Sequence, residues 1–271
     1  MEHKVWLITG TSKGFGRIWA EAALQRGDKV AATARNIDTL SELTAKYGDA
    51  VLPISLDVNN REACFEAAKK TQEHFGKIDI LVSNAGFGHF GCIEEISEAE
   101  AREQIETNVF GSLWVIQAVL PIMRAQQSGH IMQVSSIGGV TTFPTLGIYH
   151  ASKWAVEGIC DSLAQEVAGF GIKVTLIEPA GYATEWGTAS AKQSQAIEAY
   201  TGVKTALYQA FSGVPQGNPA NTASAILTLA DTENPPLRLF LGAVPLHVIE
   251  PVYAKRLAEW KAWQTVAESA Q

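Results

Sequence analysis

A chain of 271 residues is longer than an average domain, yet single α/β domains commonly reach this size, so one domain is the simpler expectation. Hydrophobic residues make up 46% and charged residues 18%, which allows a large apolar core and excludes a disordered protein. The formal net charge of -7, with no cluster of Lys and Arg, excludes a protein that works by neutralising nucleic-acid phosphates.

Cysteine usage and the N-terminus bear on the compartment. The three cysteines are far apart and form no Cys-x-x-Cys pair, so we expect neither a disulfide framework nor a thiolate metal site: Cys64, Cys92 and Cys160. The residues after Met1 lead into an apolar strand without a signal-peptide pattern. The uncharged stretch 107–123 contains Pro121 and polar residues, which makes a bilayer span unfavourable. These features predict a cytoplasmic protein without a membrane segment.

Short apolar runs recur along the chain and are continuous rather than alternating, as expected for parallel strands buried on both faces. They are 5–8, 30–34, 51–56, 78–82, 131–134, 174–177 and 239–241. Helical candidates separate them, at 16–26, 61–75, 98–123, 151–170, 219–230 and 250–267. This alternation predicts an α/β, doubly wound Rossmann fold over residues 1–271, a single domain with helices on both faces of a seven-stranded parallel sheet in the order 3-2-1-4-5-6-7.

Two segments depart from this alternation. The first, 182–218, is rich in small and polar residues and follows the sixth strand, beside the edge where open α/β sheets bind ligands. We expect a substrate-binding lid there, with a pair of ordinary surface helices as the alternative. The second, 250–271, is a C-terminal helix that carries Trp260 and Trp263. We expect it to pack on the domain, with an interaction stripe as the alternative.

A glycine-rich turn follows the first apolar run and precedes a helix: Thr9-Gly10-Thr11-Ser12-Lys13-Gly14-Phe15-Gly16. Glycines let the backbone approach a pyrophosphate, and the helix N-terminus favours its charge. The second apolar run ends in Arg35, where a carboxylate would bind the ribose of NAD, and Lys13 supplies another cation nearby. The two cations predict NADP(H) as the cofactor; two solvated surface cations are the alternative.

A phenol and an ammonium stand four residues apart in Tyr149 and Lys153, at the start of a helical candidate, so the two side chains share a helix face. A tyrosine that exchanges protons near neutral pH needs its pKa of about 10 lowered by about 3 units, and a neighbouring ammonium favours this. Tyr200 and Lys204 repeat the spacing, but Gly202 interrupts them and no strand precedes them. We expect the first pair to carry the chemistry.

The chain resembles a classical short-chain dehydrogenase/reductase over nearly its whole length, because five motifs occur in the order of that family. They are the glycine turn, Asp57-Val58, Asn84-Ala85-Gly86, Ser136 thirteen residues before Tyr149, and Pro179-Ala180-Gly181 with Thr184. The family usually has Pro-Gly where this chain has Pro179-Ala180, which would alter the turn if residue 180 required a positive φ.

The resemblance implies roles for these residues. It makes Asn108, Ser136, Tyr149 and Lys153 catalytic, with Ser136 holding the substrate oxygen and Asn108 linking the lysine through water to solvent. It makes Asp57 and Val58 neighbours of the adenine and Thr184 a partner of the nicotinamide carboxamide. The full implied set of cofactor contacts is Gly10, Ser12, Lys13, Gly14, Phe15, Gly16, Arg35, Asp57, Val58, Asn84, Ala85, Gly86, Tyr149, Lys153, Pro179, Gly181 and Thr184.

The implied function is an NADP(H)-dependent ketone or aldehyde reductase that transfers hydride between the nicotinamide and a carbonyl or secondary alcohol. A non-catalytic NADP(H) sensor and a reductase of an activated double bond are the alternatives. We expect a largely apolar substrate pocket from Phe87, His89, Phe143, Tyr182 and Trp186, although a surface-loop position is the preferred interpretation of His89. The histidines form no i, i+4 pair, so we expect no metal site. By the same resemblance we expect a homodimer or homotetramer.

Overall fold

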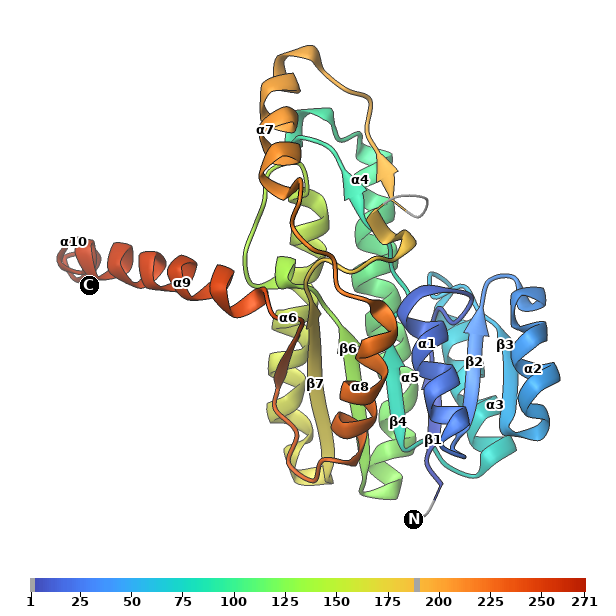
Figure 1. Ribbon diagram of the computed structural model, residues 1–271. Coiled ribbons are helices and arrows are strands. Elements are labelled where there is room, and N and C mark those ends of the chain that lie inside the picture. Colours follow the sequence, from blue (N-terminus) through green and yellow to red (C-terminus); the bar gives the residue numbers. More distant parts are fainter. Residues whose placement is uncertain (1–2, 188–190) are drawn as a thin grey trace.

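The computed structural model describes residues 3–187 and 191–271. Seven parallel strands form its central sheet in the order β3-β2-β1-β4-β6-β7-β9 (Figure 1). The strands are β1 (Val5–Ile8), β2 (Lys29–Ala34), β3 (Val51–Ser55), β4 (Ile80–Ser83), β6 (Gly129–Val134), β7 (Ile172–Pro179) and β9 (Arg238–Leu241). Each predicted strand is present and the predicted order is confirmed. Because the order reverses between β1 and β4, their carboxyl ends border the crevice where doubly wound sheets bind ligands.

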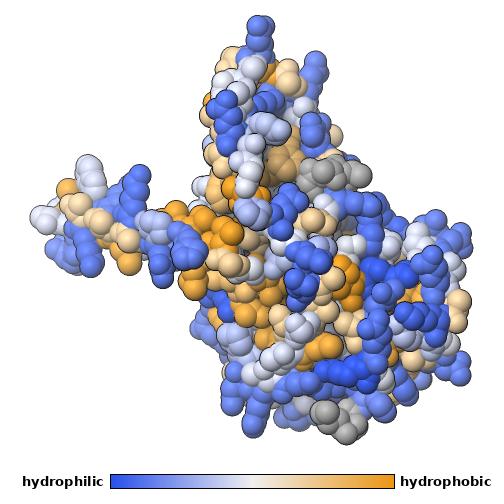
Figure 2. Space-filling view, in the orientation of Figure 1, coloured by the Kyte–Doolittle hydropathy of each residue, from blue (hydrophilic) through white to orange (hydrophobic). Residues whose placement is uncertain are grey.

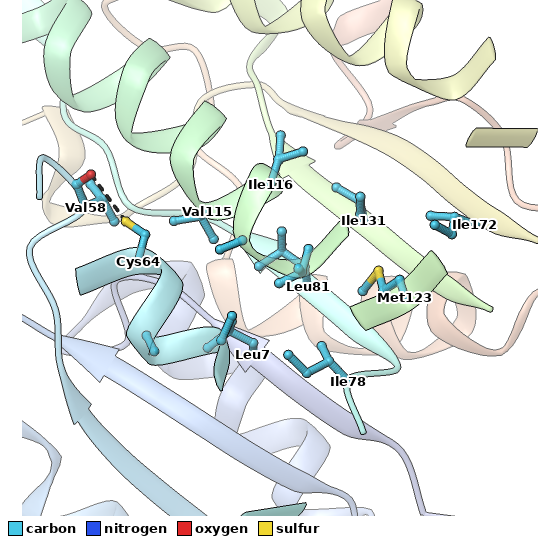
Figure 3. Close-up of a cluster of buried hydrophobic side chains, with 14 of the residues drawn as sticks. Leu7, Val58, Cys64, Ile78, Leu81, Val115, Ile116, Met123, Ile131 and Ile172 are labelled. Atoms are coloured by element: carbon cyan, nitrogen blue, oxygen red, sulfur yellow. Dashed lines mark hydrogen bonds between the residues drawn. The ribbon is translucent and has the colours of Figure 1, made fainter. Parts of the chain in front are cut away.

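Helices cover both faces of this sheet, as predicted. They are α1 (Gly14–Gln25), α2 (Ser41–Tyr47), α3 (Arg61–Phe75), α4 (Glu98–Ile105), α5 (Gly111–Gln126), α6 (Gly147–Val167) and α8 (Thr222–Asp231). Successive strand residues point to opposite faces, so the strands feed two separate cores. On one face Leu7, Leu81 and Ile131 meet side chains of α3, α5 and α6 (Figure 3). On the other face the strands meet α1, α2 and α8.

The predicted helix 98–123 is a continuous helical run of three parts, in which a π-helical turn, Glu106–Phe110, joins α4 to α5. The length and composition of this run are those of a helix that could cross a membrane. The buried core helices of other proteins meet the same criteria, so this is weak evidence for a membrane span. Here Val115, Val119 and Met123 are buried in the core of the domain. Part of the apolar surface of the run is therefore covered by the protein itself.

The segment predicted as a lid, 182–218, contains β8 (Lys192–Gln193) and α7 (Thr201–Phe211), while its residues 188–190 lie outside the described residues. β8 pairs in parallel with β5 (His89–Phe90) and forms a second, two-stranded sheet. α7 stands beyond the carboxyl ends of the central strands (Figure 1). The segment is thus folded and attached to the 89–95 region, on the side where substrate is expected.

The C-terminal helix is where the structure departs most from prediction. α9 (Pro245–Ala262) and α10 (Gln264–Glu268) extend away from the body of the domain (Figure 1). The prediction that Trp260 and Trp263 pack on the domain is wrong, because the two residues expose 62% and 64% of their surface. Within α9 the buried residues, Pro245 and Ile249, belong to its first turns. The apolar stripe is visible in the sequence, but the surface that would cover it is not.

Candidate active site

The glycine turn between β1 and α1 has the geometry of a phosphate site. Gly10 and Gly14 adopt φ angles of +71° and +61°, which favour glycine. A Cβ on Gly16 would lie 2.3 Å from the Gly10 carbonyl oxygen, so only glycine fits this approach. The first turn of α1 contains no acidic residue, and no side chain caps it. Its free amides and the positive end of the helix dipole are available to an anion, and the residues therefore fit a pyrophosphate.

Asn84, after β4, fastens this turn. Its Nδ2 donates to the carbonyl oxygens of Thr9 and Gly10, at 2.9 and 3.1 Å. The Thr9 hydroxyl accepts from the backbone amides of Asn84 and Ala85, both at 2.9 Å. These bonds tie the ends of β1 and β4 together and hold the glycine turn in place.

The two cations predicted to select NADP(H) differ in their surroundings. Arg35 is exposed immediately after β2. Lys13 forms an ion pair with Glu185 of the lid segment, with Nζ 2.5 Å from Oε2 and with both side chains more than half exposed. Exposed pairs contribute little free energy, so a phosphate could displace Glu185 from Lys13. Nearby, Asp57 is exposed and Val58 is buried against Gly111.

Ser136, Tyr149 and Lys153 come together where β6 meets the start of α6. Tyr149 is only 5% exposed, and burial raises the pKa of its phenol to about 12, although a hydrogen bond with Ser136 opposes the shift. The predicted lowering of this pKa by the neighbouring ammonium is therefore wrong, because burial disfavours the phenolate more strongly. Lys153 Nζ donates to the Val134 carbonyl at 2.9 Å and lies 5.7 Å from the centre of the Tyr149 ring. Burial lowers the pKa of Lys153 to about 8, and the carboxylate of Glu157 opposes that shift.

Asn108 lies in the π-helical turn and is almost fully buried. Its side chain accepts from the Phe87 amide at 3.1 Å and donates to the Phe87 carbonyl at 3.0 Å. It also donates to the hydroxyl of Ser152, which donates to the Tyr149 carbonyl. Asn108 therefore holds the loop after β4 against the first turn of α6. The water link to Lys153 stays a prediction.

One aromatic side chain, Trp186, packs on Tyr149, and further aromatic rings contact one another nearby in the sequence and in the lid segment. The Trp186 ring lies 4.9 Å from that of Tyr149 and 5.8 Å from that of Phe90. Phe143 lies 5.3 Å from Phe211 of α7, so the lid segment joins this aromatic group. Phe143 and Trp186 were predicted at the pocket, whereas Phe90 and Phe211 were not.

Comparisons with known proteins agree with this geometry. The family model described as short chain dehydrogenase matches residues 4–195. The chain belongs to this family. Oxidoreductase BOA17 of Botryotinia fuckeliana (strain B05.10) is 42% identical to this dehydrogenase over 88% of this chain and 89% of its own.

Two solved structures of short-chain dehydrogenases extend the comparison. The one from Streptomyces avermitilis superposes with a TM-score of 0.92 at 39% identity and covers 100% of this chain and 99% of its own. The one from Burkholderia cenocepacia J2315, in complex with NADP, gives a TM-score of 0.77 at 25% identity and covers 96% and 97%. The family resemblance drawn from the motifs is confirmed, and the chain is an oxidoreductase of this family.

Two predicted pocket residues of the dehydrogenase have other surroundings. His89 is buried in β5, not on a surface loop, and its Nε2 hydrogen bonds with the Ser194 hydroxyl at 2.8 Å. The Tyr182 ring packs edge-on against Phe15, 5.3 Å away, beside the glycine turn. Phe87 is held at the site by its backbone, and its ring lies 5.2 Å from the Lys192 ammonium. His89 and Tyr182 therefore contact other side chains of the protein, and their contact with substrate stays a prediction.

The Pro179-Ala180 departure does not strain the dehydrogenase. Among the described residues, the non-glycine residues with positive φ are Gln127 and Thr145, so Ala180 is not left-handed. Its amide donates to the Leu241 carbonyl at 3.2 Å, which continues the pairing of β7 with β9. Thr184 accepts from the Trp186 amide at 3.4 Å and thereby shapes the turn that carries this tryptophan.

Sequence reasoning missed two groups beside the site. His150 accepts from the Phe143 amide at Nε2 and donates from Nδ1 to the Gly138 carbonyl, and burial lowers its pKa, so it is a neutral clamp on the loop after Ser136. No metal-ligand grouping of His, Cys, Asp or Glu occurs within the described ranges.

The second group is a pair of carboxyl groups behind Lys153. Glu157 lies one turn further along α6, and Glu178 lies at the end of β7, fully buried. Arg238 Nε donates to Glu157 at 3.0 Å and lies 3.7 Å from Glu178. Burial, reinforced by Glu157, holds the pKa of Glu178 well above its usual range. The sequence signal of this pair was a glutamate directly after the apolar run 174–177.

Proposed function

We propose that this short-chain dehydrogenase transfers hydride between NADP(H) and a carbonyl or secondary alcohol, and that it works as a ketone or aldehyde reductase. The observation that carries the proposal is the buried group of Tyr149, Lys153 and Ser136 at the carboxyl edge of the sheet. A phenol, an ammonium and a hydroxyl in this arrangement can exchange a proton with a substrate oxygen while orienting it.

The cofactor is NADP(H), which supplies or accepts the hydride when bound. The glycine turn and the first turn of α1 would hold its pyrophosphate. Arg35 and Lys13 would bind the 2′-phosphate, and the NADP found in the related structure from Burkholderia cenocepacia supports this assignment. Because a charge-assisted hydrogen bond contributes roughly 1.5–3 kcal/mol, one good contact gives about tenfold preference for NADP(H) over NAD(H).

Proton transfer is the task of Tyr149. Burial raises the pKa of its phenol to about 12, so the phenol is protonated at neutral pH and holds the proton that carbonyl reduction requires. Lys153, largely protonated below its pKa of about 8, would stabilise the phenolate that forms when the proton leaves. Ser136 would orient the substrate oxygen by donating a hydrogen bond to it. The buried surroundings would limit competing exchange with water.

The substrate class is proposed from aromatic rings that include Trp186, which packs on Tyr149. Trp186, Phe90, Phe143 and Phe211 offer apolar surface. A bulky hydrophobic ketone or aldehyde would gain more from this surface than a small polar one, because buried apolar area contributes roughly 25 cal/mol per Å². The lid segment 182–218, which carries two of these rings, would close over the substrate. The free, buried cysteines support a cytoplasmic, reducing environment.

The test is oxidation of NADPH or NADH by the purified protein with a panel of ketones and aldehydes, followed by absorbance. We expect turnover with NADPH and a higher kcat/KM for bulky apolar carbonyls than for small polar ones. In Arg35→Ala the ratio of kcat/KM with NADPH to that with NADH should fall about tenfold. A preference for NADH would overturn the roles of Arg35 and Lys13. The reverse substrate ranking would overturn the apolar pocket. Tight NADPH binding without turnover of any carbonyl would overturn the reductase assignment.

A further inference from the structure

Glu157 continues the helix face that carries the catalytic tyrosine and lysine. Tyr149, Lys153 and Glu157 follow one another at intervals of four along α6, and side chains at this spacing lie on one face with Cβ atoms about 5–6 Å apart. All three are buried. Glu157 therefore lies one turn beyond Lys153, on the side away from Tyr149. The described salt bridges include no direct pair between Glu157 and the lysine, so its charge acts across the turn.

The loop after β6 is built around the Glu157 carboxylate. A Cβ on Gly139 would lie 2.6 Å from the Ser135 hydroxyl and 3.1 Å from Glu157 Oε1, so only glycine fits there. Ser135 is buried and directly precedes Ser136, the serine assigned to the substrate oxygen. The carboxylate is thus packed against the turn that carries this serine, within the same buried region as the ammonium of Lys153.

Glu157 and Glu178 form a buried carboxyl pair with few hydrogen-bond donors. Arg238 Nε donates to Glu157 at 3.0 Å and lies 3.7 Å from Glu178. Glu157 Oε1 and both carboxyl oxygens of Glu178 have no donor among the described residues. Burial raises the pKa of both groups, and one proton held between them supplies the donor that is lacking. The pair then carries one proton and one negative charge, and Arg238 favours the charge on Glu157.

A groove gives solvent access to this pair. It has a volume of about 470 Å³ and is lined by Gly139, Val140, Trp154, Glu157, Gly158, Arg238 and Tyr253. Tyr253 belongs to α9, and hydrophobic residues gather where α9 joins the body (Figure 2). In the described part of the chain, none of the residues predicted to contact substrate lines the groove. Protons from solvent can therefore reach Glu157 without crossing the predicted substrate pocket.

The surrounding charges leave Glu157 as the anion that acts on Lys153. The titratable groups near the pair come from α6, β9 and α9: Tyr149, His150, Lys153, Cys160, Asp161, Arg238 and Tyr253. Asp161 pairs with Arg238 at 2.8 Å, but its side chain is 45% exposed, so water screens its charge. Burial lowers the pKa of Lys153 to about 8, and Glu157 opposes this shift. Without that anion the buried amine would lose its proton more readily.

We propose that Glu157 is a positioning residue of the active site, which shares one proton with Glu178 and keeps the Lys153 ammonium charged through the carboxylate that remains. The inference rests on the proposed function, because the charge matters for catalysis only if Lys153 stabilises the phenolate of Tyr149. Removing the charge of the pair should release the lysine proton at a lower pH. The effect reaches the substrate only through Lys153.

Nuclear magnetic resonance of the full-length protein, isotope-labelled at the ε-carbon of lysine, tests the proposal without turnover. The Lys153 signal is identified by its absence from Lys153→Met, and its titration midpoint is measured. In Glu157→Gln/Glu178→Gln the midpoint should fall by at least about one pH unit, a tenfold change in the protonation equilibrium. Glu157→Gln alone should lower it by less, because Glu178 can then ionise beside Arg238. Asp161→Asn is the matched control: it removes one exposed charge from the same arginine and should keep the wild-type midpoint.

Infrared spectroscopy tests the shared proton. At about pH 7 ordinary carboxyl groups are ionised, so the carbonyl stretch of a protonated carboxylic acid reports a group such as Glu178. The band should be present in wild type and in Asp161→Asn, and it should be lost in Glu178→Gln. A wild type without this band would overturn the sharing of a proton between the two glutamates.

The pH dependence of kcat/KM then connects the charge to catalysis. If the Lys153 midpoint falls from about 8 to about 7, the ratio of kcat/KM in the double variant to that in wild type should fall about fivefold between pH 6 and pH 8. A loss that is equal at both pH values would show a structural role and overturn the proposal. An unchanged Lys153 midpoint in the folded double variant, or an equal fall in Asp161→Asn, would also overturn it. A wild type that turns over no carbonyl would overturn the reductase function, whereas the resonance midpoints would still decide whether Glu157 acts on Lys153.

Discussion

Two tyrosine–lysine pairs with the same spacing occupy different regions of the molecule. Tyr149 and Lys153 open α6 at the carboxyl edge of the central sheet, and both are more than nine-tenths buried. Lys153 donates to a backbone carbonyl, and no acid pairs directly with its ammonium among the described salt bridges. In this region burial shifts the pKa of the phenol upward and that of the ammonium downward.

The second pair belongs to the lid segment. The Tyr200 hydroxyl donates to the Glu94 carboxylate at 2.5 Å, and Lys204 Nζ donates to Glu95 at 2.6 Å. Both partners therefore fasten α7 to the segment after β5. The comparison teaches that the spacing places two side chains on one helix face, and that burial and partners decide whether the pair performs chemistry or holds an element in place.

Carboxyl groups near the two pairs differ in the same way. Behind Lys153, burial raises the pKa of Glu178, so this group favours its neutral form. Beside Lys204, the amide of Ile197 and the lysine itself hold the pKa of Glu95 down to about 2, so this group stays charged. Glu178 thus lacks the hydrogen-bond donors that would stabilise its carboxylate, whereas Glu95 has several.

The largest effect is expected at the tyrosines. Tyr149→Phe removes the proton donor and should lower kcat/KM by roughly 10²–10⁴-fold, the usual contribution of general acid catalysis. Tyr200→Phe removes a hydroxyl of the same kind from the lid fastening and should change kcat/KM only a few-fold. Steady-state kinetics with NADPH and one reactive carbonyl measures both. Equal losses of kcat/KM in the two variants would show that burial does not distinguish the two tyrosines.

A smaller effect is expected from the buried acid. Glu178 has a folded-state pKa above its ordinary value of 4.5, so the native state binds the proton more tightly than the unfolded state. Stability is therefore fully present below about pH 4.5 and falls as pH rises through the folded-state pKa. Glu178→Gln should remove this fall and gain at least about 1 kcal/mol over wild type at alkaline pH, because one pKa unit corresponds to about 1.4 kcal/mol. Thermal unfolding between pH 5 and 9 measures it; parallel curves would contradict it.

The smallest effect, opposite in sign, is expected at Glu95. Its folded-state pKa of about 2 lies below the ordinary 4.5, so its contribution to stability is present above pH 4.5 and is lost as pH falls toward 2. Glu95→Gln should therefore unfold a few degrees below wild type at pH 7, with the gap narrowing on acidification. Glu98→Gln, in an exposed pair with Arg102, is the matched control and should show little difference. A gap that widens toward acid would rule out the charged form of Glu95.

Much of the fold could be predicted because its signals are local. Continuous apolar runs located the strands. The segments between them are long enough for crossover helices, which predicted that the strands are parallel. The predicted helix 61–75 agrees with α3 in both bounds. The π-helical turn around Asn108, the small sheet of β5 and β8, and α7 depend on contacts between distant residues. Periodicity in one segment cannot indicate them.

The sequence alone determined the positions of the strands, the glycine turn and the family motifs, because each depends on residue types at short spacing. Tertiary structure decided which of two equivalent Tyr–Lys pairs is buried, placed Trp186 against Tyr149, and paired His89 with Ser194 and Tyr182 with Phe15. It also directed α9 and α10 away from the domain instead of onto it. The physical reason is the same in each case: a helix or strand pattern specifies an apolar face, but only the assembled neighbours specify what that face meets.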